Sequence, residues 1–107
     1  MSDDHRASRL DELFALVRLG EPEAFAEWMG MAELPLRRSL RRFARAVDVE
    51  AVMQEMFMRM WLVASDPQRS LEGTAASLKF AFRVARNVAL EETRRHRLNR
   101  QTDLEHL

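Results

Sequence analysis

The sequence contains no cysteine, and its 107 residues include only three glycines and three prolines. Without cysteine the chain forms no disulfide, offers no thiolate nucleophile and builds no cysteine-ligated zinc site. Because glycine and proline are scarce, little material remains for hairpin turns. Alanine, leucine, methionine, arginine and glutamate dominate the composition and favour helices. We therefore expect an all-α fold, a compact bundle of about four to five helices.

Long apolar runs are also absent, since no stretch approaches the roughly eighteen residues that a membrane span needs. The N-terminal MSDDHRASR carries no apolar signal segment. We therefore expect a cytoplasmic protein with no membrane span. The length suits one core, so residues 1–100 are predicted to form a single domain and residues 101–107 a C-terminal tail or linker.

Catalytic motifs are missing as well. His5, His96 and His106 lie too far apart in the sequence to suggest a ligand set or a catalytic dyad. The chain has no Gly-rich phosphate loop and no nucleophile elbow. We therefore predict a protein that is not an enzyme, with no catalytic residue, no metal and no cofactor.

Charge is segregated along the chain, although the formal net charge is zero. Residues 1–34 hold eight acidic groups against three arginines, whereas residues 35–47 hold five arginines and no acid. Residues 48–77 return to net negative charge, and residues 78–100 hold seven basic groups against two glutamates. All but one of the basic residues are arginine, which suits planar contacts with phosphate and carboxylate. A neutral sum therefore does not mean a neutral surface.

Residues 48–61, DVEAVMQEMFMRMW, carry the strongest helical pattern. Seven apolar positions recur at spacings of three and four, so they share one face of a helix and predict the centre of the core. Asp48 can cap this helix, which we expect to end near Ser65. The opposite face is polar apart from Met58, and it either meets a partner or is simply solvated. The predicted core stripe is Val49, Val52, Met53, Met56, Phe57, Met60 and Trp61.

Two helices are predicted before this one. Ser8, with Asp11 three residues later, resembles a capping box that begins the first helix, and Gly20 ends it. Pro22 suits the first turn of the second helix, whereas Pro35 is expected to kink that helix or restart it. The predicted buried positions are Leu10, Leu13, Phe14 and Val17, then Phe25, Trp28 and Met29, and after Pro35 the set Leu36, Leu40, Phe43, Ala44 and Val47.

Residues 66–77 have no core stripe, so they predict a loop, which is either functional or a floppy connector. In the helix that follows, basic groups gather on one side, beside a row formed by Phe80, Val84 and Asn87. Cations beside an exposed aromatic ring suit a single nucleic-acid strand. An equally simple interpretation makes Phe80 a core residue and the arginines a solvated face. The buried positions predicted for this helix are Leu78, Ala81, Phe82, Ala85, Val88 and Ala89.

Two segments together resemble region 2 of the extracytoplasmic-function sigma factors of bacterial RNA polymerase. VEAVMQEMFMRMW resembles the family's Ala-Glu-Asp-x-x-Gln-Glu-x-Phe-x-x-x-Trp signature, and FAFRVARNVALEETRR resembles its Trp-Leu-x-x-Ile-Ala-Arg-Asn motif with the acid and arginines that follow. GEPEAFAEWM and the later Pro-Leu-Arg-Arg resemble the first helices of the same domain. The matching positions are Glu50, Gln54, Glu55, Phe57 and Trp61, then Ala85, Arg86, Asn87, Glu91, Arg94 and Arg95, with Val84 for the isoleucine.

The chain also departs from the family's pattern. Ala51 stands where the family usually has Asp, Phe80 where it has Trp, and Ala81 where it has Leu. The family's loop before the last helix receives a base flipped from the promoter, but residues 66–77 contain no aromatic residue, which puts the base preference in doubt. No second helix-turn-helix domain follows, so we expect either one domain of a longer sigma factor or a freestanding relative.

The resemblance implies a domain that binds core RNA polymerase through the coiled coil of its β′ subunit and that recognises and melts the minus-ten promoter element on the non-template single strand. An anti-sigma factor is a further implied partner. The alternative is a sigma-like decoy that binds an anti-sigma factor without touching DNA. The predicted polymerase-binding residues are Glu50, Gln54, Glu55, Met58 and Arg59. The predicted DNA-binding residues are Lys79, Phe80, Arg83, Arg86, Asn87, Arg94, Arg95 and Arg97.

Overall fold

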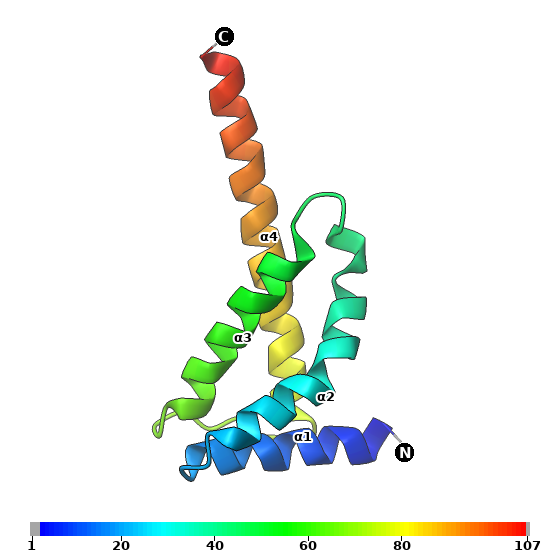
Figure 1. The fold of residues 1–107 in the computed structure, drawn as a ribbon, viewed down its shortest axis with the longest axis vertical. Helices are drawn as coiled ribbons and strands as arrows, with labels where there is room; N and C mark the ends of the chain where they lie inside the picture. The colour runs from blue at the N-terminus through cyan, green and yellow to red at the C-terminus, as the bar shows by residue number, and fades with distance from the viewer. Residues whose placement is uncertain (1–2, 107) are drawn as a thin grey trace.

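The computed structural model describes residues 3–106, and within them it contains helices and connecting turns but no strand. Figure 1 shows α1 lying across one end of the molecule, with α2, α3 and α4 rising from that end. The prediction of an all-α bundle is therefore confirmed. The elements are α1 (Asp3–Arg18), α2 (Glu23–Ser39), the 3₁₀ turn η1 (Arg41–Phe43), α3 (Val49–Ser65) and α4 (Ala76–Glu105).

Helix α3 begins and ends as its sequence predicts. The Asp48 side chain accepts hydrogen bonds from the backbone N–H groups of Glu50 at 3.0 Å and Ala51 at 3.4 Å, satisfying two donors that the first turn leaves open. The helix ends at Ser65. Most of its stripe is buried, but the prediction for Trp61 is wrong, because 38% of this residue is exposed. Val52, Met53, Met56 and Met60 are buried, as are Val63 and Ala64, whereas Val49 and Phe57 are partly buried.

Helix α1 starts earlier than predicted. Ser8 lies inside the helix, not at its start, so the capping-box prediction is wrong. The Asp11 carboxylate is used elsewhere, since it binds the first turn of α4. Gly20 ends the helix as predicted, at φ 99°, in a Schellman arrangement where the N–H of Glu21 reaches the Leu16 carbonyl at 3.0 Å. The predicted stripe Leu10, Leu13, Phe14 and Val17 is buried.

Helix α2 runs through Pro35 without restarting. Pro35 has no N–H to donate to the carbonyl one turn back, and Figure 1 shows the course of α2 bending along its length. Beyond Pro35 the α-helix continues only to Ser39, and the rest of the predicted helix is replaced by the single 3₁₀ turn η1. Leu36, Leu40 and Val47 are buried as predicted and Phe43 is partly buried, but the prediction for Ala44 is wrong, because this residue is exposed.

Trp28 of α2 lies at the centre of the core and is fully buried. Its ring stacks on Phe25 with centroids 5.6 Å apart, tilts against Phe14 at 5.6 Å and meets Phe57 edge-on at 6.3 Å. The indole N–H donates to Ser77 Oγ at 3.2 Å. The side chain thus joins α1, α3 and α4 to α2, and its polar atom is satisfied as a buried indole requires.

Helix α4 is the longest element, and the far part of it stands clear of the bundle. Its first half packs alanines closely against the core, with Ala81, Ala85 and Ala89 buried beside Val88. From Arg94 to His106 every residue is exposed, and Figure 1 shows this end extending beyond the other helices. Residues 101–105 continue the helix without a break. Within residues 3–106, none of the helices combines the length and the apolar composition that a bilayer crossing demands.

Candidate protein and nucleic-acid interfaces

A row of cations lies along the outer side of α4. Lys79, Arg83, Arg86, Arg94 and Arg97, which we call the basic stripe, are all exposed. They follow one another at spacings of three and four, with Leu90 between Arg86 and Arg94, so they share one face over about 27 Å of helix. In the described part of the chain, none of the five forms an ion pair.

Three other predicted DNA-binding residues occupy different positions around α4. Asn87 is exposed beside the stripe, one turn from Arg83, and its amide carries both a donor and an acceptor. Arg95 lies off the stripe and donates to Glu92 at 2.9 Å. Phe80 is partly buried and packs against the core, so the sequence's expectation of an exposed aromatic row is only half met. The structure therefore brings the stripe and Asn87 together and separates Arg95 from them.

A groove of about 350 Å³ runs beside Phe80, between the end of α3, the connecting loop and α4. We call it the loop groove. Arg69 of the loop places its guanidinium 5.7 Å from the Phe80 ring centroid, in a cation–π contact. The groove thus combines one aromatic face, apolar walls and the cation Arg69, beside the carboxylate of Asp66, and an aromatic face next to a cation is an element of a site for an unstacked base. Its lining is Arg59, Leu62, Val63, Asp66, Arg69, Phe80 and Val84.

The loop between α3 and α4 is held at its far end by two partly buried hydrogen bonds. Asp11 accepts from the backbone N–H of Ser77 at 2.9 Å and from its hydroxyl at 2.8 Å. The Asp11 carboxylate of α1 contacts the first turn of α4, where the helix dipole favours a negative charge. The prediction of a loop over residues 66–77 is confirmed except that α4 begins at Ala76. Its last residues are therefore fixed to α1.

The predicted polymerase-binding residues differ in how exposed they are and in whether they form ion pairs within the chain. Gln54 is exposed, and Met58 is 64% exposed. Glu50 pairs with Arg37 of α2, which also binds Glu33. The outer face of α3 is thus polar at its start and becomes apolar towards its end.

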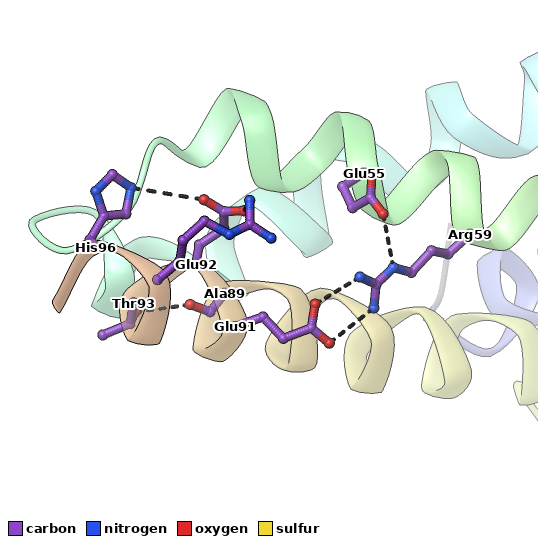
Figure 2. A network of polar contacts seen from close by, with 8 residues as sticks. Glu55, Arg59, Ala89, Glu91, Glu92, Thr93 and His96 are labelled. Carbon is purple, nitrogen blue, oxygen red and sulfur yellow. Dashed lines mark hydrogen bonds and ion pairs between the residues drawn. The ribbon is translucent and has the colours of Figure 1, made fainter. Parts of the chain in front are cut away.

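Arg59 turns towards α4 and not towards solvent. Its guanidinium donates to Glu55 Oε1 at 3.1 Å and to both carboxylate oxygens of Glu91, at 2.7 and 3.3 Å, as Figure 2 shows. The hydrogen bond with Arg59 is the main reason why the pKa of Glu91 is lowered, and the pKa of Arg59 is correspondingly raised. This residue links α3 to α4, so the structure does not leave it free for a partner as the sequence suggested.

An apolar groove of about 300 Å³ opens beside Met58, between α2 and α3. Trp61 meets Phe25 edge-on across it, with ring centroids 5.3 Å apart, and Leu62 at its rim is 68% exposed. Exposed apolar surface next to polar residues is typical of a site where another protein binds. The sequence pointed to Met58 but missed Leu62, which lay outside the predicted stripe. The lining residues are Phe25, Met29, Phe57, Met58, Trp61 and Leu62.

Nothing in residues 3–106 suggests a metal site, since no cluster of three or more histidine or acidic side chains occurs there. The fold and these surfaces define an all-α bundle with one basic face and one mixed apolar and polar face. The chain matches no protein-family model, no curated protein and no solved structure.

Proposed function

We propose that this chain is a promoter-binding domain of the extracytoplasmic-function sigma factor type, acting in the cytoplasm without catalytic chemistry of its own. In this role α4 and the loop groove bind the non-template single strand of the minus-ten element. The outer face of α3 binds the β′ coiled coil of core RNA polymerase. Capture of the opened strand then stabilises the melted promoter against the few kcal/mol that each unpaired base costs.

The observation that carries the proposal is the basic stripe. Five cations at helical spacing, with no ion pair among the described residues, form a track for phosphates. They run beside the loop groove, where Phe80 offers a ring to a base. A merely solvated helix face would be expected to alternate its charges and pair them, as α1 and α2 do through Arg9 and Glu27.

The α3 face supports the protein-binding half of the proposal. Gln54 and Met58 stand exposed on one side of the helix and continue into the apolar groove beside Trp61. Ala51, exposed on the same face, lacks the carboxylate of the family's signature, so this contact depends more on apolar burial. The same groove would serve the alternative function, a decoy that binds an anti-sigma factor and no DNA.

Binding of a fluorescent single-stranded minus-ten oligonucleotide tests the proposal. Affinity should fall as salt rises, and Arg83→Ala and Arg94→Ala should each reduce the log–log slope by about 0.7, the loss of one phosphate contact. Arg95→Ala is the matched control, because Arg95 is exposed on the same helix but off the stripe. If neither stripe variant changes affinity or slope, strand binding is refuted and the decoy becomes the better account.

A further inference from the structure

A cleft of about 420 Å³ lies between the turn after η1 and the second half of α4, and Arg97 is the one residue of its lining that also belongs to the basic stripe. Three arginines line it: Arg45 from the turn, and Arg97 and Arg100 from α4. His96 and Thr93 complete the polar lining. The walls thus come from segments about fifty residues apart in the sequence, and together they place three arginines around one cleft.

The positive charge in the cleft is not neutralised within the described chain. None of the three arginines forms an ion pair there, and no carboxylate is among the residues that line the cleft. Along α4, Glu92 precedes the cleft and is contacted by Arg95 at 2.9 Å and by His96 at 3.8 Å. Asp103 lies three residues after Arg100, but among the described residues it forms no ion pair with it. Like charges gathered in a concave surface concentrate a positive potential, and an anion relieves their mutual repulsion.

The lining indicates which anion fits. Planar guanidinium groups bind phosphate oxygens in pairs, so three of them suit more than one phosphate. The cleft has no phenylalanine or tryptophan on which a base could stack, and its only apolar residues are Ala46 and Val47. Single-strand sites combine cations with aromatic rings, whereas a duplex keeps its bases stacked inside and presents only its backbone outward. With no phenylalanine or tryptophan, and with the small imidazole of His96 as the ring in its lining, the three arginines of the cleft therefore favour a duplex backbone.

Arg97 belongs both to the cleft and to the basic stripe. A strand lying along the stripe therefore leads directly to the cleft at the C-terminal end of α4. We propose that this cleft binds consecutive backbone phosphates of double-stranded DNA that adjoins the captured single strand. The inference rests on the proposed function for its biological setting, but the cleft's own affinity for phosphate can be measured without it.

The experiment compares two fluorescent probes in anisotropy titrations over a range of salt: the single-stranded oligonucleotide, and the same strand with a duplex at one end. Arg45→Gln and Arg100→Gln should weaken binding of the partial duplex by roughly fivefold to tenfold and reduce its salt slope by about 0.9 each. Both should leave the single strand unaffected. Arg83→Gln should weaken both probes, and Arg95→Gln neither. Circular dichroism verifies that each exposed-site variant is folded.

The outcomes separate the two proposals. If the partial duplex binds and depends on Arg45 while the single strand does not bind at all, the proposed function fails and the cleft assignment stands. If Arg45→Gln and Arg100→Gln both bind the partial duplex with wild-type affinity, the assignment of the cleft to duplex DNA is overturned. Inorganic tripolyphosphate and poly-glutamate serve as competing probes. If either probe binds in a way that depends on Arg45, while both variants keep their affinity for the partial duplex, the ligand is a free polyphosphate or an acidic protein. That result also overturns the assignment of the cleft to duplex DNA.

Discussion

Arg59 and Glu91 join α3 to α4 through two parallel hydrogen bonds, with Nη2 2.7 Å from Oε2 and Nη1 3.3 Å from Oε1 (Figure 2). A bidentate pair fixes orientation as well as distance. Here the pair fixes the position of α3 relative to α4. The outer face of α3 is proposed to bind protein, and α4 carries the basic stripe. The two residues lie 32 positions apart in the sequence, and both were singled out for other reasons.

The Arg59–Glu91 pair should make a small, measurable and pH-dependent contribution to stability. Both side chains are more than a third exposed, so a double-mutant cycle with Arg59→Gln and Glu91→Gln should give a coupling of about 0.5 kcal/mol in urea unfolding. Because the folded pKa of Glu91 is lowered, this stability is present above the ordinary glutamate pKa, about 4.3, and is lost as the pH falls through the lower folded value.

The difference in the free energy of unfolding between wild type and Glu91→Gln should therefore be largest at pH 7 and vanish in strong acid. Glu72→Gln provides the control, because Glu72 is exposed in the loop and forms no ion pair among the described residues. A coupling that persisted unchanged at low pH would mean that packing of the two stems, and not charge, holds the helices together.

The Asp11–Ser77 contact should matter more than the surface pair. Asp11→Ala leaves the N–H and hydroxyl of Ser77 without their acceptor next to the buried Trp28 indole, which should cost about 1 to 3 kcal/mol in chemical denaturation. Asp11→Asn keeps an acceptor oxygen and should cost less. Asp4→Ala, an exposed carboxylate in the same helix, should be nearly neutral. Equal losses for Asp11 and Asp4 would contradict a structural role for this network.

The sequence predicted what depends on local periodicity and failed where distant segments meet. The helical spacing found the core faces of α1, α3 and α4, and Asp48 was recognised as a cap because capping is a local interaction. The partners of Asp11 and Arg59 lie 66 and 32 residues away, and no local pattern encodes them. The residues after Leu40 kept a helical spacing but formed only one 3₁₀ turn, because spacing does not report backbone conformation.

The candidate sites were predicted to a similar extent. The stripe followed from charge and spacing, and the structure retains all five of its cations on one face. The arginine cleft was missed, although the acid-free run of residues 35–47 was visible. Only the fold shows that Arg45 lines the same cleft as Arg97 and Arg100, because the turn after η1 returns to the second half of α4.

Two residues of α3 should separate core packing from surface function. Met56 is completely buried, so Met56→Ala should cost about 2 to 5 kcal/mol in thermal or urea unfolding. Trp61 is 38% exposed and contacts Phe25 edge-on, so Trp61→Ala should cost only about 1 to 2 kcal/mol. A loss for Trp61→Ala as large as that for Met56→Ala would show that the apolar groove is closed in solution.

The protein-binding face is tested by placing charge in the middle of it. Met58→Glu, combined with Gln54→Ala, should leave the unfolding midpoint nearly unchanged and lower affinity for core RNA polymerase at least about tenfold, because a buried contact of this kind is worth more than about 1.4 kcal/mol. Leu19→Glu is the matched control, since Leu19 is an exposed apolar residue at the end of α1. Unchanged affinity in a titration would place the interface elsewhere.

Phe80 tests whether the loop groove receives a base. Because the ring is partly buried and packs against the core, Phe80→Ala should reduce stability. If a base also stacks on it, the same variant should weaken single-strand binding by roughly 1 to 3 kcal/mol. Phe57→Ala is the matched control, because Phe57 is also partly buried but lines the apolar groove and not the loop groove.

Both variants should therefore unfold more easily, but only Phe80→Ala should lose affinity for the oligonucleotide under conditions where each is fully folded. Arg69→Ala, which removes the guanidinium near the Phe80 ring, should weaken binding without a comparable loss of stability, because Arg69 is exposed. If Phe80→Ala and Phe57→Ala bind the strand equally well, the Phe80 ring serves packing alone, and the strand would then be held through phosphates only.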